Sequence, residues 1–405
     1  MTARGPVTRT VPRLPVEAAA VPVDPIGQRT RADVFATVLT AGPLSRVQIA
    51  ERLGLSQSTV TKIVNPLVET GYLREEGVAS GGIGRPRRLL RVQQDRHVLV
   101  GVKIAPDRVT AVLTDMGAEV LCRTEHPLDG HTPAQALKAA ADAANELLAA
   151  AADAAGRVLA IGVGVSGHVD PTTGTCRFSA LLDWREVDIA GPLSAATGLP
   201  VVVSNDVNTL VVAEQWFGQG RDTDTFAVVT VGSGVGCGLL LGGRLHLGRS
   251  GLAGEFGHQP LDPAGPVCDC GSRGCLEALA SHGAVLGRLR AAGVSGCDDI
   301  DAAAALARSG HGRDAKAALG AFAEAGQALG RGLAGLCNLL NPQKIILAGE
   351  GASLQDLFAP AMTAALREHA FSSAAADCEV VVDEVNDDLW ARGAACLVIR
   401  DAVGI

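Results

Sequence analysis

Short apolar runs alternate with long alanine-rich stretches from His97 to the end of the chain. The runs suit β-strands and the stretches suit helices, so the alternation predicts an α/β fold in which helices cover a sheet. We predict strands over residues 98–104, 108–116, 120–125, 158–165, 201–204, 226–231, 238–241 and 344–348. We predict helices over residues 133–155, 208–217, 276–292 and 314–340. Because one strand-rich series is followed by a second with glycine-rich turns, the pattern indicates two related lobes.

The length of 405 residues exceeds one ordinary domain. Hydrophobic residues make up 47% of the chain but aromatic residues only 3%, which is typical of an α/β protein rather than a disordered one. The apolar runs are shorter than the roughly 18 residues that a membrane-spanning helix needs. The first 24 residues contain Pro and Arg where a signal peptide has its apolar stretch. We therefore expect a cytoplasmic protein without a membrane partner.

The charge is distributed unevenly along the chain. The net charge is −8, but residues 1–95 hold 13 Lys and Arg against 8 Asp and Glu, which makes this part basic. A basic segment on an acidic protein is the candidate binder of nucleic acid. Within it, residues 1–28 contain five prolines and no sustained periodicity, so we predict a flexible leader there.

Residues 29–95 have the pattern of a winged helix-turn-helix. Apolar side chains recur at helical spacing in three successive stretches, and residues 74–92 follow as a glycine-rich hairpin. Gly54 suits a tight turn at positive φ, and Ser56 can accept free amides at the start of the third helix. Pro66 lies inside this third helix, where an interior proline costs ~3 kcal/mol, so we expect a bend in its far half.

Two sets of polar side chains in this segment suit double-stranded operator DNA. The third helix leaves five side chains off its apolar face for base edges and phosphates: Gln57, Ser58, Thr59, Thr61 and Lys62. The hairpin has a cationic tip that can hold phosphates or enter the minor groove, formed by Arg85, Arg87 and Arg88. The alternative is a three-helix interaction domain whose arginines are only solvated.

One histidine and three of the ten cysteines form a metal-binding pattern. His258, Cys268, Cys270 and Cys275 have the spacing H-x9-C-x-C-x4-C, and such ligands suit a structural zinc ion in a reducing compartment. The alternatives are a chance cluster and a redox pair. We interpret the other seven cysteines as small buried hydrophobic residues: Cys122, Cys176, Cys237, Cys297, Cys337, Cys378 and Cys396.

Polar residues near two of the predicted strands suit a polyhydroxylated ligand. Asn205 and Asp206 follow the apolar run 201–204, at the strand end where α/β sheets bind ligands. Glu255 precedes His258, and Glu277 follows the cysteines, so the zinc loop can bring these acids together. Taken singly, each acid is more often a surface or capping residue. The glycine run 232–238 can cradle a phosphate with its amides or can serve turn geometry alone.

These motifs together resemble the ROK family (repressors, open reading frames and kinases), in its regulator branch. The resemblance extends from Arg29 to the C-terminus and rests on residues 84–86, 201–208, 232–238, 251–258 and 268–277. It implies a winged helix-turn-helix followed by a two-lobed actin-like (ribonuclease-H-like) domain. Its first lobe would comprise residues 96–215 and 385–405, and its second lobe residues 216–384. It also implies a homodimer or homotetramer and a sugar bound between the lobes by Asn205, Asp206, Glu255, His258 and Glu277.

The chain departs from the kinases of this family. Those kinases begin their first lobe with an Asp-x-Gly-Gly-Thr-like phosphate loop, whereas this chain has Lys103-Ile104-Ala105-Pro106-Asp107. A proline without an amide hydrogen cannot reproduce that backbone cradle. Ala180 also stands near a position where family kinases commonly have Asn. Asp206 matches the catalytic base of the kinases, so it would be catalytic only if this chain were a kinase.

The sequence therefore predicts a sugar-responsive regulator of carbohydrate genes, and it favours repression that sugar relieves over activation by sugar. Sugar binding would change the angle between the lobes, with zinc holding Glu255 and His258 in place, and the change would reach the DNA-binding heads. One alternative is an ATP-dependent sugar kinase with an accessory DNA-binding head. Another is a DNA-binding scaffold without a ligand, in which Glu255 would have no part in regulation.

Overall fold

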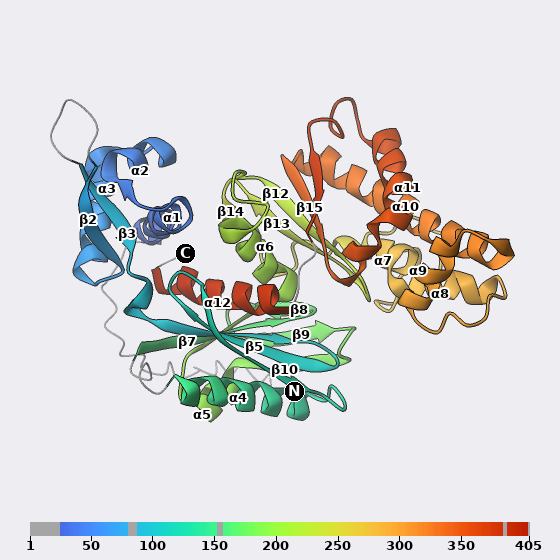
Figure 1. Ribbon diagram of the computed structural model, residues 1–405, viewed down its shortest axis with the longest axis horizontal. Helices are drawn as coiled ribbons and strands as arrows, with labels where there is room; N and C mark the ends of the chain where they lie inside the picture. The colour runs from blue at the N-terminus through green and yellow to red at the C-terminus, as the bar shows by residue number, and fades with distance from the viewer. Residues whose placement is uncertain (1–24, 80–86, 152–156, 384–386, 404–405) are drawn as a thin grey trace, which may run out of the picture.

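The computed structural model describes residues 25–79, 87–151, 157–383 and 387–403. Figure 1 shows an N-terminal head, in blue, beside two lobes that are each built on their own sheet. We call these the head, the first lobe and the second lobe. Among the described residues, no helix is both long enough and apolar enough to cross a bilayer.

The head is a three-helix unit with a small antiparallel sheet. It contains α1 (Pro25–Ala41), β1 (Leu44–Ser45), α2 (Arg46–Leu53), α3 (Gln57–Glu69), β2 (Leu73–Ala79) and β3 (Arg87–Val92), with strand order β1-β3-β2. Helix α1 begins four residues before the predicted start at Arg29, so the predicted leader, which ended at residue 28, is too long. A proline fits there because the first turn of a helix has no partner for its amides.

The turn between α2 and α3 forms as predicted. Gly54 has a φ of 64° and ends α2, and its amide bonds to the carbonyl of Ala50. The Ser56 hydroxyl accepts the amide of Thr59 at 3.1 Å, which satisfies a free donor at the start of α3. Helix α3 continues through Pro66 to Glu69. The positions of the exposed N-terminal turns of α3 are thus fixed by two caps that the sequence encodes.

The first lobe contains a mixed five-stranded sheet. Strands β4 (Val98–Ile104), β5 (Arg108–Asp115) and β6 (Val120–Pro127) form an antiparallel meander, and β7 (Val158–Val165) and β11 (Val201–Asn205) continue it in parallel on the other side of β4. Helix α4 (Pro133–Ala150) packs on β5 and β6. Between β7 and β11 lie three short strands and a helix that we did not predict: β8 (His168–Asp170), β9 (Thr175–Ser179), β10 (Trp184–Asp188) and α5 (Ala190–Thr197).

The second lobe repeats this topology. Strands β12 (Phe226–Val231), β13 (Val235–Leu241) and β14 (Arg244–Leu245) form the meander, and β15 (Lys344–Ala348) and β16 (Glu379–Val382) are the parallel strands. The sheet orders are β11-β7-β4-β5-β6 and β14-β13-β12-β15-β16, so the third, second, first, fourth and fifth strands are neighbours in both lobes. This equivalence confirms the predicted pair of related lobes and the actin-like architecture.

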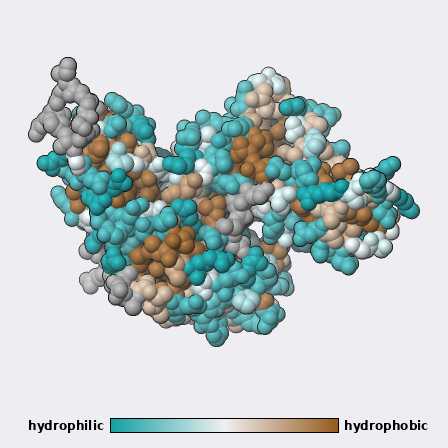
Figure 2. All heavy atoms as spheres, in the orientation of Figure 1, coloured by the Kyte–Doolittle hydropathy of each residue, from teal (hydrophilic) through white to brown (hydrophobic). Residues whose placement is uncertain are grey.

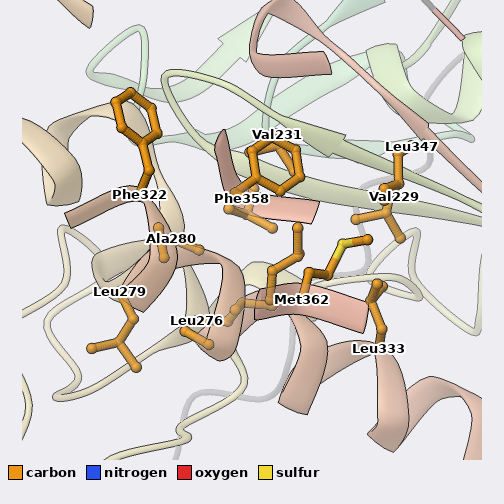
Figure 3. Packing of buried hydrophobic residues seen from close by; sticks show 14 of the residues in the cluster. Val229, Val231, Leu276, Leu279, Ala280, Phe322, Leu333, Leu347, Phe358 and Met362 are labelled. Carbon is orange, nitrogen blue, oxygen red and sulfur yellow. The ribbon is translucent and has the colours of Figure 1, made fainter. Parts of the chain in front are cut away.

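Helices cover the second sheet, and their apolar side chains form the core of the second lobe together with those of the strands. Helices α10 (Gly312–Leu340) and α11 (Gln355–His369) pack on each other, and α7 (Leu276–Ala280), α8 (His282–Ala291) and α9 (Ile300–Ser309) pack against α10. Figure 3 shows Phe322 of α10 and Phe358 of α11 in the same cluster as Val231 of β12. The predicted helix over residues 276–292 is wrong at Ser281, which has extended backbone and caps α8 by accepting the amide of Ala284.

The last helix, α12 (Asp387–Val403), returns the chain to the first lobe, where it contacts β4, β7 and α6 (Asp206–Phe217). It lies very close to the sheet because Gly101 and Gly162 are register partners on β4 and β7. A Cβ atom on Gly101 would lie 1.9 Å from the carbonyl oxygen of Ala391, and one on Gly162 would lie 1.8 Å from that of Ala394. Figure 1 shows α12, in red, between this sheet and the head.

The head packs directly on this layer. Helix α1 contacts α12 and α6, and Phe35 and Val38 of α1 belong to the same apolar cluster as Trp216 of α6 and Ile399 of α12. The head and the first lobe therefore share a core.

Polar side chains cover most of the visible surface of the head in Figure 2, and the apolar areas of this view are separate patches.

Candidate functional site

The predicted DNA-contacting residues of α3 fall into two groups. Gln57, Ser58 and Lys62 are exposed. Thr59 and Thr61 are half-buried and bond to their own helix: the Thr59 hydroxyl lies 2.8 Å from that of Ser56, and the Thr61 hydroxyl donates to the carbonyl of Gln57 at 2.8 Å. The Ser58 hydroxyl also lies 2.8 Å from that of Ser56, so within the exposed group Gln57 and Lys62 can reach a DNA groove without breaking any of these bonds. The two threonines support the start of the helix.

Among the three arginines predicted at the wing tip, Arg88 is the one whose side chain the structure describes. Its side chain is 72% exposed and pairs with Glu75 on β2, and this hydrogen bond raises the pKa of Arg88. Glu75 also accepts from Arg46 of α2 at 2.8 Å, so one carboxylate connects the wing to the helices. We did not predict Arg46 or Glu75 as part of this face. Arg85 lies outside the described residues, and of Arg87 only the backbone, at the start of β3, is described.

The four predicted metal ligands lie together. One ligand atom from each of His258, Cys268, Cys270 and Cys275 lies within 4.8 Å of all the others. The Cys268 sulfur is 3.6 Å from His258 Nδ1, and the Cys270 and Cys275 sulfurs are 3.7 Å apart. Three thiols and one imidazole at this spacing match the donors and geometry of a tetrahedral zinc site.

Glycine turns allow the chain to close around these ligands. Gly274 has a φ of 65°, and a Cβ atom on it would lie 1.6 Å from the carbonyl oxygen of Asp262. This close approach sets the direction of Cys275, which directly precedes α7. His258 ends the short helix η3 (Phe256–His258) on the other side. Two local elements thus present the ligands to each other.

The same loop brings Glu255 and Glu277 next to His258. A Glu255 carboxylate oxygen lies 3.9 Å from His258 Nε2, and burial raises the pKa of Glu255. Glu277 accepts the amide of Val235 at 3.0 Å, and its other oxygen lies 3.8 Å from the Cys268 sulfur. With Nδ1 facing Cys268, the histidine presents its remaining nitrogen towards Glu255.

Asn205 and Asp206 lie on the first lobe, where β11 meets α6. Asn205 caps α6: its side-chain oxygen accepts the amide of Val207 at 2.9 Å, and its amide group donates to the carbonyl of Gly167 at 3.0 Å. Asp206 is buried. Strand β13 contacts both halves of the predicted sugar site. Gly236 packs against the side chain of Val207, which follows Asp206, and the amide of the neighbouring Val235 donates a hydrogen bond to Glu277.

Asp206 has a partner that sequence reasoning missed. The ammonium group of Lys103, at the end of β4, forms an ion pair with the Asp206 carboxylate, and both residues are less than 10% exposed. The same ammonium group lies 4.3 Å from the centroid of the Trp390 ring of α12. The available signal was a lysine within an otherwise apolar strand, because a buried lysine needs an anionic partner.

The glycine run also has an unpredicted neighbour. The amide of Ser233 donates to the carboxylate of Glu350 at 3.0 Å. A Cβ atom on Gly232 would lie 1.9 Å from this carboxylate oxygen, so glycine is needed for the contact. The turn that could cradle a phosphate therefore already has an anionic group of the chain at one of its amides.

A winged helix-turn-helix head on an actin-like, two-lobed domain defines a class of DNA-binding regulators that are built on a sugar-kinase fold. The ROK family profile matches residues 99–401, and the MarR family profile matches residues 28–82. The chain belongs to the ROK family.

The relatives of the chain include named repressors. It is 28% identical over 383 residues to the putative xylose repressor of Caldicellulosiruptor sp. (strain Rt8B.4), covering 91% of this chain and 94% of that one. It is 30% identical over 383 residues to the N-acetylglucosamine repressor of Escherichia coli O6:H1 (strain CFT073), covering 93% and 94%. A solved ROK family transcriptional regulator, a homologue of the E. coli MLC protein, superposes with a TM-score of 0.78 at 27% identity, covering 94% and 97%.

Proposed function

We propose that the chain is a cytoplasmic DNA-binding repressor whose affinity for operator DNA responds to a sugar bound between the lobes, without phosphoryl transfer. The observation that carries this proposal is the shared core of the head and α12, because it joins a DNA-binding unit to the domain that would hold the sugar. The repressors among the relatives support the same function.

The ion pair between Lys103 and Asp206 argues against kinase activity. A kinase of this fold needs a free carboxylate as base for the sugar hydroxyl. Here the buried ammonium group of Lys103 neutralises that carboxylate. Glu350 accepts a hydrogen bond from the Ser233 amide, which would otherwise be available to a phosphate. Release of ADP with any hexose, lost in Asp206→Asn, would establish the rival function.

The cysteine cluster is proposed to hold a structural zinc ion. Zinc bound through His258 Nδ1 would fix the imidazole ring and direct its Nε2 towards Glu255. The ion would also hold α7 in place, which starts at Leu276 and carries Glu277. Its contribution would be to position the sugar-binding side chains, namely Asn205, Asp206, Glu255, His258 and Glu277.

The exposed side chains of α3 are proposed to contact the operator, with phosphate contacts from the wing arginines Arg85, Arg87 and Arg88. A homodimer or homotetramer would present two heads to an inverted-repeat site, since the spacing of half-sites must match the spacing of the heads. Sugar binding would change this spacing and release the DNA, so that carbohydrate genes are expressed when their substrate is present.

The test is a titration of operator DNA with the full chain, read by fluorescence anisotropy, in the presence of xylose, glucose, N-acetylglucosamine and their phosphates. We expect one sugar to weaken binding by about tenfold or more, a typical size for coupling between two sites. Glu255→Gln should reduce this response, and Glu368→Gln, at the exposed end of α11, is the matched control. A chain that binds DNA but responds equally little to every sugar would overturn the proposal in favour of the scaffold.

A further inference from the structure

Lys103 connects the first lobe's part of the sugar site to α12. Its ammonium group pairs with Asp206, at the start of α6, and lies over the ring of Trp390, in the first turns of α12. Lys103 and Trp390 are each 9% exposed. A lysine buried to this degree cannot lose its anionic partner without gaining another acceptor, because an unpaired buried charge is costly.

A second connection joins the same two helices. The hydroxyl of Thr209 is 2.6 Å from the carbonyl oxygen of Asp206 and 3.2 Å from that of Trp390. A Cβ atom on Gly393, one turn further along α12, would lie 2.2 Å from the carbonyl oxygen of Thr209. Asp206, Thr209, Trp390 and Lys103 therefore form a closed ring of contacts, and a change at Asp206 must be accommodated at the start of α12.

The far half of α12 packs on the head. Residues 395–399 of α12 belong to the apolar cluster that includes Val34, Phe35 and Val38 of α1. From Trp390 to Ile399 a helix spans roughly 14 Å at about 1.5 Å per residue. One rigid element thus reaches from the ring of contacts around Lys103 to the helix that supports the DNA-binding head.

We propose that Lys103 is the positioning residue that transmits sugar binding to the head, an inference that rests on the proposed function. A sugar hydroxyl that donates to the Asp206 carboxylate competes with the Lys103 ammonium group, which then turns to a sugar oxygen. This movement changes its contact with the Trp390 ring, and α12 carries the shift to α1. Lys103 acts here through Asp206 and Trp390 and has no chemical step of its own.

The inference is tested with Lys103→Met in the full chain. The quantity measured is the ratio of operator Kd at saturating sugar to operator Kd without sugar, so that a changed sugar affinity does not affect the result. We expect the ratio to fall from about tenfold in the wild type to less than about twofold in Lys103→Met, while sugar still binds by calorimetry. Lys103→Arg, which keeps the charge, should retain most of the response. The matched control is Lys138→Met, because the side chain of Lys138 on α4 is 75% exposed.

A second measurement does not depend on the folding of the lysine variant. The chain has three tryptophans, and the Lys103 ammonium group lies over the ring of Trp390, whereas Trp184 and Trp216 are almost fully buried. Sugar should therefore change the fluorescence of Trp390, and Trp390→Phe should abolish that change while sugar still binds. An unchanged wild-type spectrum at saturating sugar, or a Lys103→Met variant that responds like the wild type, overturns the inference alone. A wild type whose DNA affinity no sugar alters overturns the proposed function and this inference with it.

Discussion

The guanidinium group of Arg221 donates a hydrogen bond of 2.7 Å to the carbonyl of Thr40 at the end of α1. Arg221 lies between α6 and β12, so this bond connects the head to the segment that joins the two lobes. Arg221→Ala should lower the free energy of unfolding by about 0.5–1.5 kcal/mol, the usual contribution of one hydrogen bond. Urea unfolding measures this, with Arg313→Ala as an exposed control. Equal stabilities of the two variants would show that the bond contributes nothing.

The contact between α12 and the first sheet predicts a large effect of one methyl group. Gly162→Ala would place a Cβ atom 1.8 Å from the carbonyl oxygen of Ala394, so α12 or β7 has to move. We expect a loss of roughly 3 kcal/mol or more, comparable to overpacking of a core. Gly320→Ala is the control, because no atom lies within 4 Å of its Cβ position and alanine favours a helix by about 1 kcal/mol. Thermal unfolding should move in opposite directions for the two variants.

Glu214 predicts a specific dependence of stability on pH. It is fully buried on α6, and burial, together with the nearby carboxylate of Asp383, raises its pKa from 4.5 to about 7. Between these values the folded chain keeps a proton that the unfolded chain has released. The contribution of Glu214 therefore becomes less favourable as the pH rises from about 4.5 to 7.

Glu214→Gln tests this dependence, because glutamine keeps the shape without titrating. The variant should gain on the order of 2–3 kcal/mol relative to the wild type at pH 8, and the difference should shrink towards pH 5. Chemical denaturation at several pH values measures it, with the exposed Glu368→Gln as control. A difference that does not vary with pH would contradict the assignment.

Metal analysis tests the cysteine cluster directly. We expect one zinc ion per chain, and loss of the ion in Cys275→Ser together with a lower melting temperature, since binding of a metal to the folded state is folding free energy. Cys122→Ser, on β6, should keep the ion. The purified chain binding no zinc through these thiols would exclude a metal role for the loop.

Lys62 predicts a measurable electrostatic contribution to DNA binding. Its side chain is exposed on α3, where it can contact a phosphate. Lys62→Ala should weaken binding to all DNA sequences to a similar extent and lower the slope of log K against log salt by about one unit. Lys316→Ala, on α10, should leave the slope unchanged. An unchanged slope in Lys62→Ala would place this side chain away from the DNA.

The fold could be predicted wherever the local sequence pattern of a segment is enough to specify its secondary structure. Strands β4, β7, β12 and β15 have the predicted bounds because buried strands are continuous apolar runs between turn signals. The short strands β8 to β10 could not be predicted, since their burial depends on neighbours from elsewhere in the chain. The break at Ser281 could have been found from its capping side chain. Helix α12 was missed because its partners, Gly101 and Gly162, are far away in sequence.

The candidate site shows the same division. The sequence places the four metal ligands within one loop, so their spacing alone predicted a cluster. The partners of Lys103 and Ser233 come from segments more than 100 residues away. From the sequence, Lys103 indicates only the loss of a phosphate loop, and its ion pair with Asp206 forms because the fold brings the end of β4 to the start of α6. Long-range pairs of charges are set by tertiary packing, which no local pattern encodes.

The continuous apolar layer from α1 through α12 to Leu99 and Met116 of the first lobe has a practical consequence. A fragment that ended after the wing would expose the side of α1 that packs on α12 and α6, and a fragment that began there would expose the side of α12 that packs on α1. Neither fragment keeps the shared core intact, so exchanging heads between regulators of this kind also requires changing the residues of α12 that face the head.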